Sequence, residues 1–178
     1  GQLGDRRLRL GIAGGEWKKM MADATARTRF ASEVKKIIEQ YEFDGVDFDF
    51  EWPANASEYN NYSATVIQMR STLGKYVYFT ASLHPVSFKI SPEAIDALDF
   101  ISYQCYGPAV MRFPYEQFVK DGEAAVAYGI PKNKLVMGVP FYGSTGSLIA
   151  AYCDFVNDGL ATTNEDTYTY KGNTYTFN

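Results

Sequence analysis

Three acidic side chains alternate with large aromatic ones in a short run in the first third of the chain. Asp47, Asp49 and Glu51 are separated by Phe48 and Phe50. Successive side chains of a strand point to opposite faces, so the carboxyl groups would share one face and the rings the other. A carboxyl group close to other carboxyl groups keeps its proton to a higher pH, which suits a general acid. The run therefore predicts acid catalysis by the last of the three, Glu51.

The placement of these carboxyl groups favours catalysis over two other interpretations. Glu51 ends the run, at the place where barrel enzymes carry catalytic groups, and Asp49 lies about 6.5 to 7 Å behind it. A Mg²⁺ site would draw oxygen ligands from several strands, whereas the other strand ends carry Tyr, Gln, Ser and the single His. A solvated acidic edge strand would not need large aromatic residues on its opposite face. We therefore expect no metal ion and no other cofactor.

The acidic run is one of five strand-like segments that alternate with helical patterns. The strand candidates are residues 8–13, 45–51, 76–83, 98–106 and 135–141. The helical patterns between them cover residues 20–41, 58–73, 92–97 and 115–128. Strands that alternate with helices form crossover units around a parallel sheet. The apolar face of the acidic strand should then contact helices, and its carboxyl groups should line the inside of a barrel.

The spacing of these units predicts an α/β fold, part of a (β/α)8 TIM barrel. A closed eight-stranded barrel takes about 250 residues, so a chain of 178 residues is short by roughly three units. An open doubly wound sheet is the competing fold, but no G-x-G-x-x-G motif follows the first strand. We expect the partial barrel to cover residues 1–146. Residues 147–178 should form a polar, Tyr- and Thr-rich excursion of the same domain, with a short hairpin around Lys171, Gly172 and Asn173.

Composition and charge exclude several other classes of protein. With 46% hydrophobic residues and a net charge of −4, the chain is neither disordered nor suited to binding nucleic acid. No apolar run approaches the roughly 18 to 20 residues of a membrane helix. Two cysteines are too few for a disulfide scaffold. We expect Cys105 to pack as a small apolar group and the lone His84 to have a structural role.

Residues 44–51 resemble the signature of a known enzyme family. They read DGVDFDFE, are followed by Trp-Pro, and are similar to the D-x-x-D-x-D-x-E signature of glycoside hydrolase family 18, the chitinases and endo-β-N-acetylglucosaminidases. Further similarities are a Gly-Gly pair at residues 14–15, LDFI at residues 98–101 and VMGVPFYG at residues 136–143. The resemblance extends over nearly the whole chain and implies strands three to seven of the family's barrel, with part of the insertion before strand eight. Strands one, two and eight would come from flanking sequence.

The resemblance also implies a role for each residue of the signature. Glu51 would protonate the glycosidic oxygen, while the 2-acetamido carbonyl of the substrate acts as the nucleophile. Asp49 would orient the acetamido N–H group, and Asp47 would hold Asp49 through a shared proton. Tyr106, in the position of the tyrosine of the family's M-x-Y-D motif, would hydrogen-bond the acetamido oxygen. Asp44 would support the entry of the strand.

The M-x-Y-D motif of the family is altered in this chain. Gln104 and Gly107 stand where the family has methionine and aspartate. The environment of the acid and the distortion of the substrate are therefore expected to differ from the usual chitinase pattern. The other candidates for contacting sugar are Gln104 and the aromatic residues near strand ends, because rings stack on the apolar faces of sugars. These aromatic residues are Trp17, Trp52, Tyr103 and Tyr142.

The resemblance implies an enzyme, a chitinase-like glycoside hydrolase that acts with retention on β-1,4-linked N-acetylglucosamine. Its partner would be chitin or an oligosaccharide containing N-acetylglucosamine. It would act outside the cell, at the cell surface or in the periplasm, although the first residues contain no signal peptide. One alternative is an endo-β-N-acetylglucosaminidase acting on glycoprotein glycans, which uses the same carboxyl groups. Another is a non-catalytic chitin-binding lectin of the same fold, but such lectins typically lose the acid, and Glu51 is present.

Overall fold

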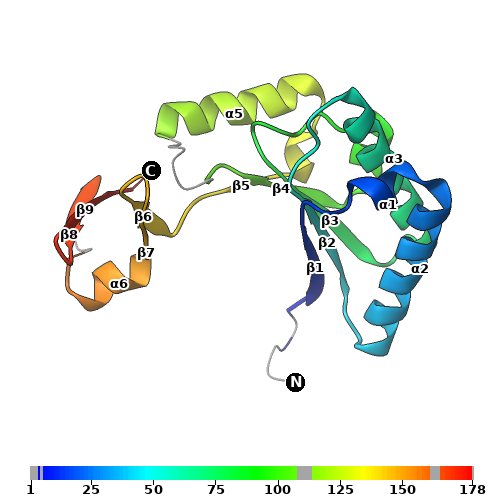
Figure 1. The fold of residues 1–178 in the computed structure, drawn as a ribbon, viewed down its shortest axis with the longest axis horizontal. Helices are drawn as coiled ribbons and strands as arrows, with labels where there is room; N and C mark the ends of the chain where they lie inside the picture. The colour runs from blue at the N-terminus through cyan, green and yellow to red at the C-terminus, as the bar shows by residue number, and fades with distance from the viewer. Residues whose placement is uncertain (1–3, 5, 108–113, 161–164, 178) are drawn as a thin grey trace. The chain divides into compact units, whose positions relative to one another are not determined.

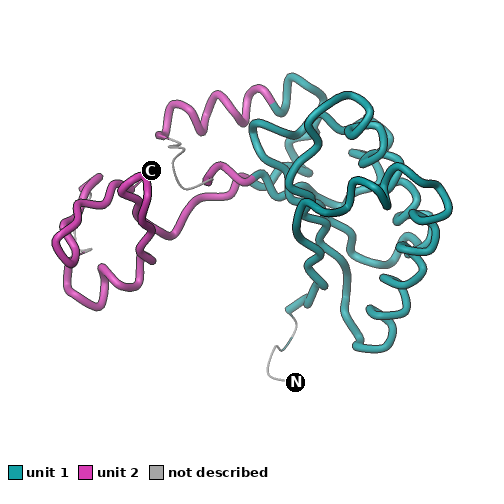
Figure 2. Tube along the Cα trace, in the orientation of Figure 1, with its two compact units in different colours: residues 1–103, 125–136 teal, residues 104–124, 137–178 magenta. Residues whose placement is uncertain are grey.

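The computed structural model describes residue 4 and residues 6–107, 114–160 and 165–177 of the chain. Its contacts divide it into two compact units, which are coloured separately in Figure 2. The first unit comprises residues 1–103 and 125–136, and the second comprises residues 104–124 and 137–178. Each unit is organised around its own β-sheet.

The first unit is built on a five-stranded sheet with the order β1-β2-β3-β4-β5 (Figure 1). The strands are β1 (Arg9–Gly14), β2 (Gly45–Phe50), β3 (Tyr78–Leu83), β4 (Phe100–Gln104) and β5 (Leu135–Gly138). The pairs β1–β2, β2–β3 and β3–β4 are parallel. All five strands coincide with predicted strand segments, and their sequential order confirms the predicted α/β class.

Five described helices connect these strands: α1 (Lys18–Ala22), α2 (Ala24–Gln40), α3 (Ala56–Leu73), α4 (Pro92–Ala97) and α5 (Tyr115–Tyr128). Three of them, α2, α3 and α4, begin at a residue whose side chain caps the helix. The prediction of one continuous helix over residues 20–41 was wrong, because Asp23 interrupts it. Asp23 is extended, with φ −109° and ψ 122°, and its side chain accepts the N–H of Ala26 at 2.6 Å. It therefore ends α1 and caps α2, as Asn55 caps α3.

The apolar face of β2 packs against the helices, as the alternation predicts. Phe48 and Phe50 are no more than 1% exposed. Their ring centroids lie 5.2 Å and 5.6 Å from that of Tyr62 on α3, and Phe48 also lies 6.0 Å from Phe30 on α2. Burying each such ring contributes about 1.5 to 3 kcal/mol, which decides which face of β2 turns toward the helices. The carboxyl groups of the strand consequently lie on the other face.

Two glycines allow β2 to lie close to its neighbours. A Cβ atom at Gly45 would lie 1.9 Å from the carbonyl oxygen of Tyr78, at the start of β3. A Cβ atom at Gly15 would lie 2.7 Å from the carbonyl oxygen of Glu51. Atoms of a larger residue cannot occupy these positions without moving the backbone, so glycine is required at both. Both glycines belong to the motifs that carry the family resemblance, and the close approach of the strands explains their presence.

Local contacts and residue types also explain where β2 and β4 begin and where β5 ends. Asp44 precedes β2 and its Oδ2 atom accepts the N–H of Leu8 at 2.6 Å, so it ties the start of β2 to the start of β1. β4 is shorter than predicted because Leu98 still forms the C-terminal cap of α4. β5 ends at Gly138, before Pro140, whose ring nitrogen cannot donate a hydrogen bond to another strand.

The second unit contains a four-stranded sheet with the order β7-β6-β9-β8 (Figure 1). Its elements are β6 (Tyr142–Ser144), β7 (Ile149–Ala151), α6 (Tyr152–Asn157), β8 (Thr167–Tyr170) and β9 (Asn173–Thr176). β8 and β9 confirm the predicted hairpin, whose two turn residues have φ of 48° and 78°, as a tight two-residue turn requires. β6, β7 and α6 are not predicted, because elements of three to six residues carry little periodic signal. The antiparallel pair β6–β7 crosses the predicted limit between residues 146 and 147.

Phe155 of α6 is the centre of a small hydrophobic core in the second unit. Its ring is fully buried, and the ring centroids of Phe177, Tyr175 and Tyr168 lie 4.9, 5.5 and 6.1 Å away. Ala150 of β7 belongs to the same buried cluster. The polar composition of this segment therefore conceals a core, which is built from every second residue of the hairpin strands.

Candidate active site

The three carboxyl groups of the acidic run lie on one face of β2 and at its carboxyl end. Asp47 and Asp49 are half-buried on the strand, and Glu51 is exposed directly after it. On β1, the residues paired with Asp47 and Asp49 are Gly11 and Ala13, whose small size leaves room beside the carboxyl groups. The predicted alternation of the strand is thereby confirmed.

Asp47 is held by side chains of both neighbouring strands. Its Oδ2 atom accepts a hydrogen bond from the hydroxyl group of Ser82 at 2.9 Å, and its Oδ1 atom accepts one from the hydroxyl group of Thr80. Nη1 of Arg9 lies 3.3 Å from Oδ1 and also donates to the Thr80 hydroxyl group. Both carboxylate oxygens of Asp47 thus have donors from the protein, which fixes their orientation.

Tyr62 supports the acidic strand from the side of α3. It is completely buried, and its hydroxyl group donates to the carbonyl oxygen of Phe48 at 3.3 Å. Burial, followed by the negative charges of Asp47 and Asp49, raises the pKa of Tyr62. The phenol therefore stays neutral and acts as a fixed hydrogen-bond donor to the strand.

Trp52 follows Glu51 and lies against His84. Trp52 is half-buried, and its ring centroid is 5.2 Å from that of His84. His84 is 1% exposed, and its Nδ1 atom accepts the N–H of Val86 at 3.2 Å. The predicted structural role of His84 is confirmed, since it is buried beneath the Trp52 ring. The role of Trp52 as a sugar platform stays a prediction.

The structure places Tyr103 and Trp17 on the helix side of the sheet. Tyr103 is completely buried, with its ring centroid 5.7 Å from that of Phe88, so the prediction that it contacts sugar was wrong. Alternation along β4 explains the burial, because Tyr103 points to the face opposite that of Gln104. Trp17 is half-buried, and its ring centroid lies 6.5 Å from that of Phe48. Its role as a sugar platform stays a prediction.

Gln104, Tyr106 and Tyr142 belong to the second unit. Gln104 is the last residue of β4, and Tyr106 lies half-buried two positions beyond it. Gly107 has a φ of +59°, and a Cβ atom added to it would lie 3.8 Å from the hydroxyl oxygen of Tyr142. The structure therefore brings Tyr142 next to the position where the resemblance places an aspartate. The roles of these residues toward sugar stay predictions.

Cys105 lies between Gln104 and Tyr106 in the chain and is 1% exposed. Burial, followed by the charge of Asp121, raises the pKa of the Cys105 thiol to about 12. Because the thiolate is the reactive form, this thiol is unreactive near neutral pH. Its predicted role as a small packing group is confirmed.

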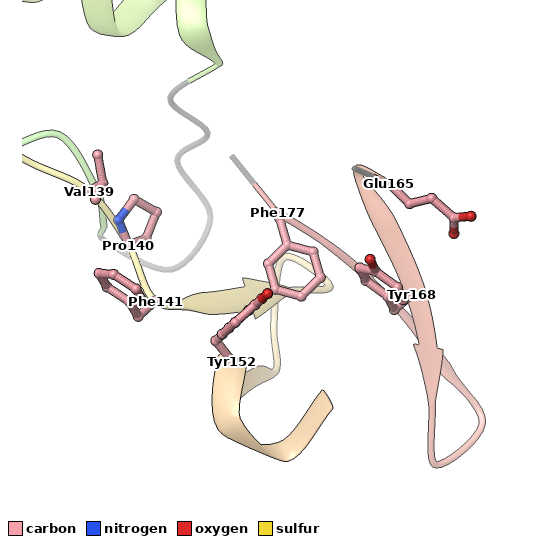
Figure 3. Close-up of a pocket in the computed structure, with 7 residues that line it drawn as sticks. All are labelled: Val139, Pro140, Phe141, Tyr152, Glu165, Tyr168 and Phe177. Carbon is pink, nitrogen blue, oxygen red and sulfur yellow. The ribbon is translucent and has the colours of Figure 1, made fainter. Parts of the chain in front are cut away.

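Figure 3 shows a pocket of the second unit that is not predicted from the sequence. Its volume is about 400 Å³, and its lining is mainly aromatic. The lining residues are Val139, Pro140, Phe141, Tyr152, Glu165, Tyr168 and Phe177. They come from the segment after β5, the start of α6, the hairpin strand β8 and both flanks of the hairpin. No local pattern groups residues that are so far apart along the chain.

The chain as a whole matches a known family. The family described as Glycosyl hydrolases family 18 matches residues 6–176. The chain belongs to this family. Among its relatives, "Probable chitinase 2" of Drosophila melanogaster is 26% identical over 189 residues, which cover 85% of this chain and 37% of the relative. The endochitinase of Manduca sexta is 28% identical over 168 residues, which cover 76% of this chain and 30% of the relative.

Solved structures of family 18 chitinases share the fold of this family 18 chain. A chitinase from the chitin utilization locus of Flavobacterium johnsoniae has a TM-score of 0.79 at 23% identity, over 97% of this chain and 61% of that protein. A chitinase from Cycas revoluta, in complex with (GlcNAc)3, has a TM-score of 0.75 at 19% identity, over 95% and 68% of the two chains. The predicted barrel class is confirmed by this similarity. The chain spans about a third of the length of the two curated relatives.

The described part of this family 18 chain holds neither a membrane-spanning helix nor a cluster of potential metal ligands. None of its described helices has the length and apolar character needed to cross a membrane. Within the same residues, no three His, Cys, Asp or Glu side chains are grouped so that they could hold a metal ion.

Proposed function

We propose that the protein is a glycoside hydrolase that cleaves chains of β-1,4-linked N-acetylglucosamine, with Glu51 as its general acid. The observation that carries the proposal is the contrast between two carboxyl groups of one strand. Asp47 has hydrogen-bond donors on both oxygens, whereas Glu51 is exposed at the carboxyl end. Barrel enzymes bind their substrates at the carboxyl ends of the strands. Membership of family 18 and the similarity to chitinases support the choice of substrate.

In the proposed first step, the acetamido oxygen of the substrate attacks C1 while Glu51 gives its proton to the glycosidic oxygen. The C1–O bond breaks, the leaving sugar departs as an alcohol, and an oxazolinium ion remains beside the Glu51 carboxylate. Asp49 accepts the acetamido N–H and balances the positive charge that develops on that group.

In the proposed second step, Glu51 takes a proton from water, and the water oxygen attacks C1. The bond between C1 and the acetamido oxygen breaks, so the acetamido group is restored and the β configuration is retained. Tyr106 donates a hydrogen bond to the acetamido oxygen in this proposal. Trp52, Gln104 and Tyr142 contact neighbouring sugars, and Trp17 is a further candidate for such a contact.

The proposal also requires a complete barrel around the acidic strand. The described sheet has five strands, and closing it into a ring of eight needs three more. We propose that sequence flanking the chain supplies them, and that the protein acts outside the cell or at its surface, where an insoluble polysaccharide is accessible.

Hydrolysis of chitopentaose by the intact protein tests the proposal. We expect the parent protein to release β-anomeric products, seen by NMR before mutarotation, and to leave cellopentaose intact because it lacks the acetamido nucleophile. An initial α anomer, or equal cleavage of cellopentaose, would exclude this mechanism. Cleavage restricted to a glycopeptide carrying an N-linked glycan would favour an endo-β-N-acetylglucosaminidase. Binding of chitopentaose without hydrolysis would favour a lectin.

A further inference from the structure

The pocket in Figure 3 is built by residues that have no role in the proposed reaction. Tyr142 directly follows Phe141 but does not line the pocket, and its hydroxyl oxygen would lie 3.8 Å from a Cβ atom added to Gly107. The candidate contact to the substrate and the lining of the pocket thus use different side chains of one segment. The pocket is therefore a candidate site of its own.

Backbone hydrogen bonds and ring contacts hold the aromatic wall of the pocket in place. The N–H of Tyr152 donates to the carbonyl oxygen of Phe141 at 2.9 Å, and the N–H of Phe177 donates to that of Asp166 at 2.9 Å. The ring of Phe177 lies between those of Tyr152 and Tyr168, with centroid distances of 6.0 Å and 5.4 Å (Figure 3). The wall is formed without a ligand, so binding does not have to order it.

Apolar side chains at this pocket are open to solvent. Phe141 is 74% exposed, Val139 is 53% exposed and Tyr152 is 39% exposed. None of the three belongs to the hydrophobic core around Phe155. Apolar side chains that are exposed together around a cavity commonly mark a ligand site, and open ring faces suit the apolar face of a sugar.

The segment that contains the pocket is acidic. Residues 137–178 include four acidic side chains and one basic side chain, Lys171, which gives them a net charge of −3. Nζ of Lys171 lies 4.8 Å from the ring centroid of Tyr170, and neither residue lines the pocket. Glu165 is exposed at the edge of the pocket, and among the described residues its carboxylate has neither an ion pair nor a hydrogen bond (Figure 3). The pocket thus offers ring faces and negative charge, a combination that attracts cations.

We infer that the pocket is a second sugar site, which binds an amino-sugar unit that has lost its acetyl group and carries a protonated amino group. Such a unit has an apolar ring face for Phe141 and Tyr152 and a positive charge for the ring faces and the Glu165 carboxylate. A neutral sugar lacks the charge, and an acidic sugar would be repelled. The choice of an amino sugar rests on the function proposed above, because partly deacetylated chains of N-acetylglucosamine contain these units.

Titration calorimetry of the intact protein with a β-1,4-linked pentamer of glucosamine tests this inference. The amino groups of the pentamer are protonated at about pH 5.5, and without acetamido groups it is not consumed by the proposed reaction. Its affinity should be at least about 10-fold lower in the double variant Phe141→Ala, Tyr152→Ala. Ile149→Ala is the matched control and should keep the parent affinity, since Ile149 is an exposed apolar residue of the second unit outside the pocket.

A single charge change tests the site even if the double variant does not fold. Glu165→Gln keeps the rings, and it should lower the affinity about 3-fold and reduce the dependence of binding on salt. Parent affinity in Glu165→Gln, or absence of binding to the parent protein, would overturn the inference.

Chitopentaose and the Glu51→Gln variant separate this site from the proposed active site. The affinity of Glu51→Gln for chitopentaose should not change when the two pocket substitutions are added, and an equal loss for chitopentaose would overturn the preference for a charged sugar. Binding of the glucosamine pentamer that depends on Glu51 and not on Phe141 and Tyr152 would overturn the second site. Binding at the pocket by a protein that does not hydrolyse chitopentaose would instead refute the proposed function alone.

Discussion

The two ends of the five-stranded sheet use charged side chains in different ways. At the amino end, Arg70 of α3 donates to three carbonyl oxygens and to the carboxylate of Asp99, over 2.6 to 3.0 Å. Lys134, just before β5, donates to three carbonyl oxygens at the end of α4, over 2.7 to 3.1 Å. At the carboxyl end, Glu51 is exposed, and among the described residues its carboxyl group has no hydrogen bond.

This difference separates the charges that stabilise the fold from the charge that is available to a ligand. Cations bonded to several backbone carbonyls hold the ends of helices and loops in place, so their loss should reduce stability. An exposed carboxyl group without protein partners contributes little to stability. Its loss should therefore lower the rate of hydrolysis and leave the stability of the fold unchanged. In barrel enzymes, stability and catalysis are commonly divided between the two ends of the strands in this way.

The largest effect is expected for Glu51→Gln. Amide nitrogen cannot supply the proton, so the rate of chitopentaose hydrolysis should fall by at least about 10²- to 10⁴-fold. The melting temperature should stay that of the parent, since no protein contact is lost. Glu33→Gln, on the exposed surface of α2, is the matched control and should keep full activity. Unchanged hydrolysis in Glu51→Gln would exclude Glu51 as the acid.

Arg70→Met should be the most destabilising change at the amino end. It removes the side-chain donor of three carbonyl oxygens and leaves Oδ2 of Asp99 with the N–H of Phe79 alone, so the free energy of unfolding should fall by about 3 kcal/mol. Urea denaturation measures this change, with exposed Arg29→Met as control. The kcat of the folded fraction should be that of the parent. A stability equal to that of the control would mean that this network does not hold the amino end together.

A smaller loss is expected for Lys134→Met. Its ammonium group caps the carbonyl oxygens of Ile95, Asp96 and Leu98, so removing it should cost about 1 to 2 kcal/mol of unfolding free energy. Hydrogen exchange should become faster at the amides of α4 in particular. Faster exchange throughout the sheet, with α4 no more affected than β2, would contradict a local capping role.

The smallest effect is expected at Glu58, a second glutamate near the carboxyl end of β2. A hydrogen bond from Lys18, followed by one from the N–H of Ala54, holds the pKa of Glu58 below its ordinary value of 4.5. Because the folded pKa is the lower one, this contact stabilises the protein above that value and the contribution is lost as the pH falls. Glu58→Gln should remove that part of the acid dependence of the melting temperature and leave hydrolysis unchanged. A loss of activity in this variant would contradict the inference that a carboxyl group bonded to protein donors takes no part in hydrolysis.

Much of the first unit follows from local sequence patterns. Periodicity locates the five strands, and alternation assigns the aromatic residues of β2 to the helix side. The same alternation also carries the information that Tyr103 faces away from Gln104, so its burial is predictable from β4 itself. The second unit is harder to predict, because the pairing of β6 with β7 and β9 depends on three-residue strands without a periodic signal.

The sequence by itself determined the line of carboxyl groups on one face, the alternation of strands with helices and the resemblance to family 18. These features depend on neighbouring residues, whose side-chain directions follow from the strand geometry alone. Only the tertiary structure decided which donors meet Asp47. Arg9 and Thr80 lie 38 and 33 positions away from it in the chain, and their contacts exist because strand pairing sets the register. That register depends on close approaches such as the one at Gly45, which involve atoms of two strands at once and leave no periodic trace in either.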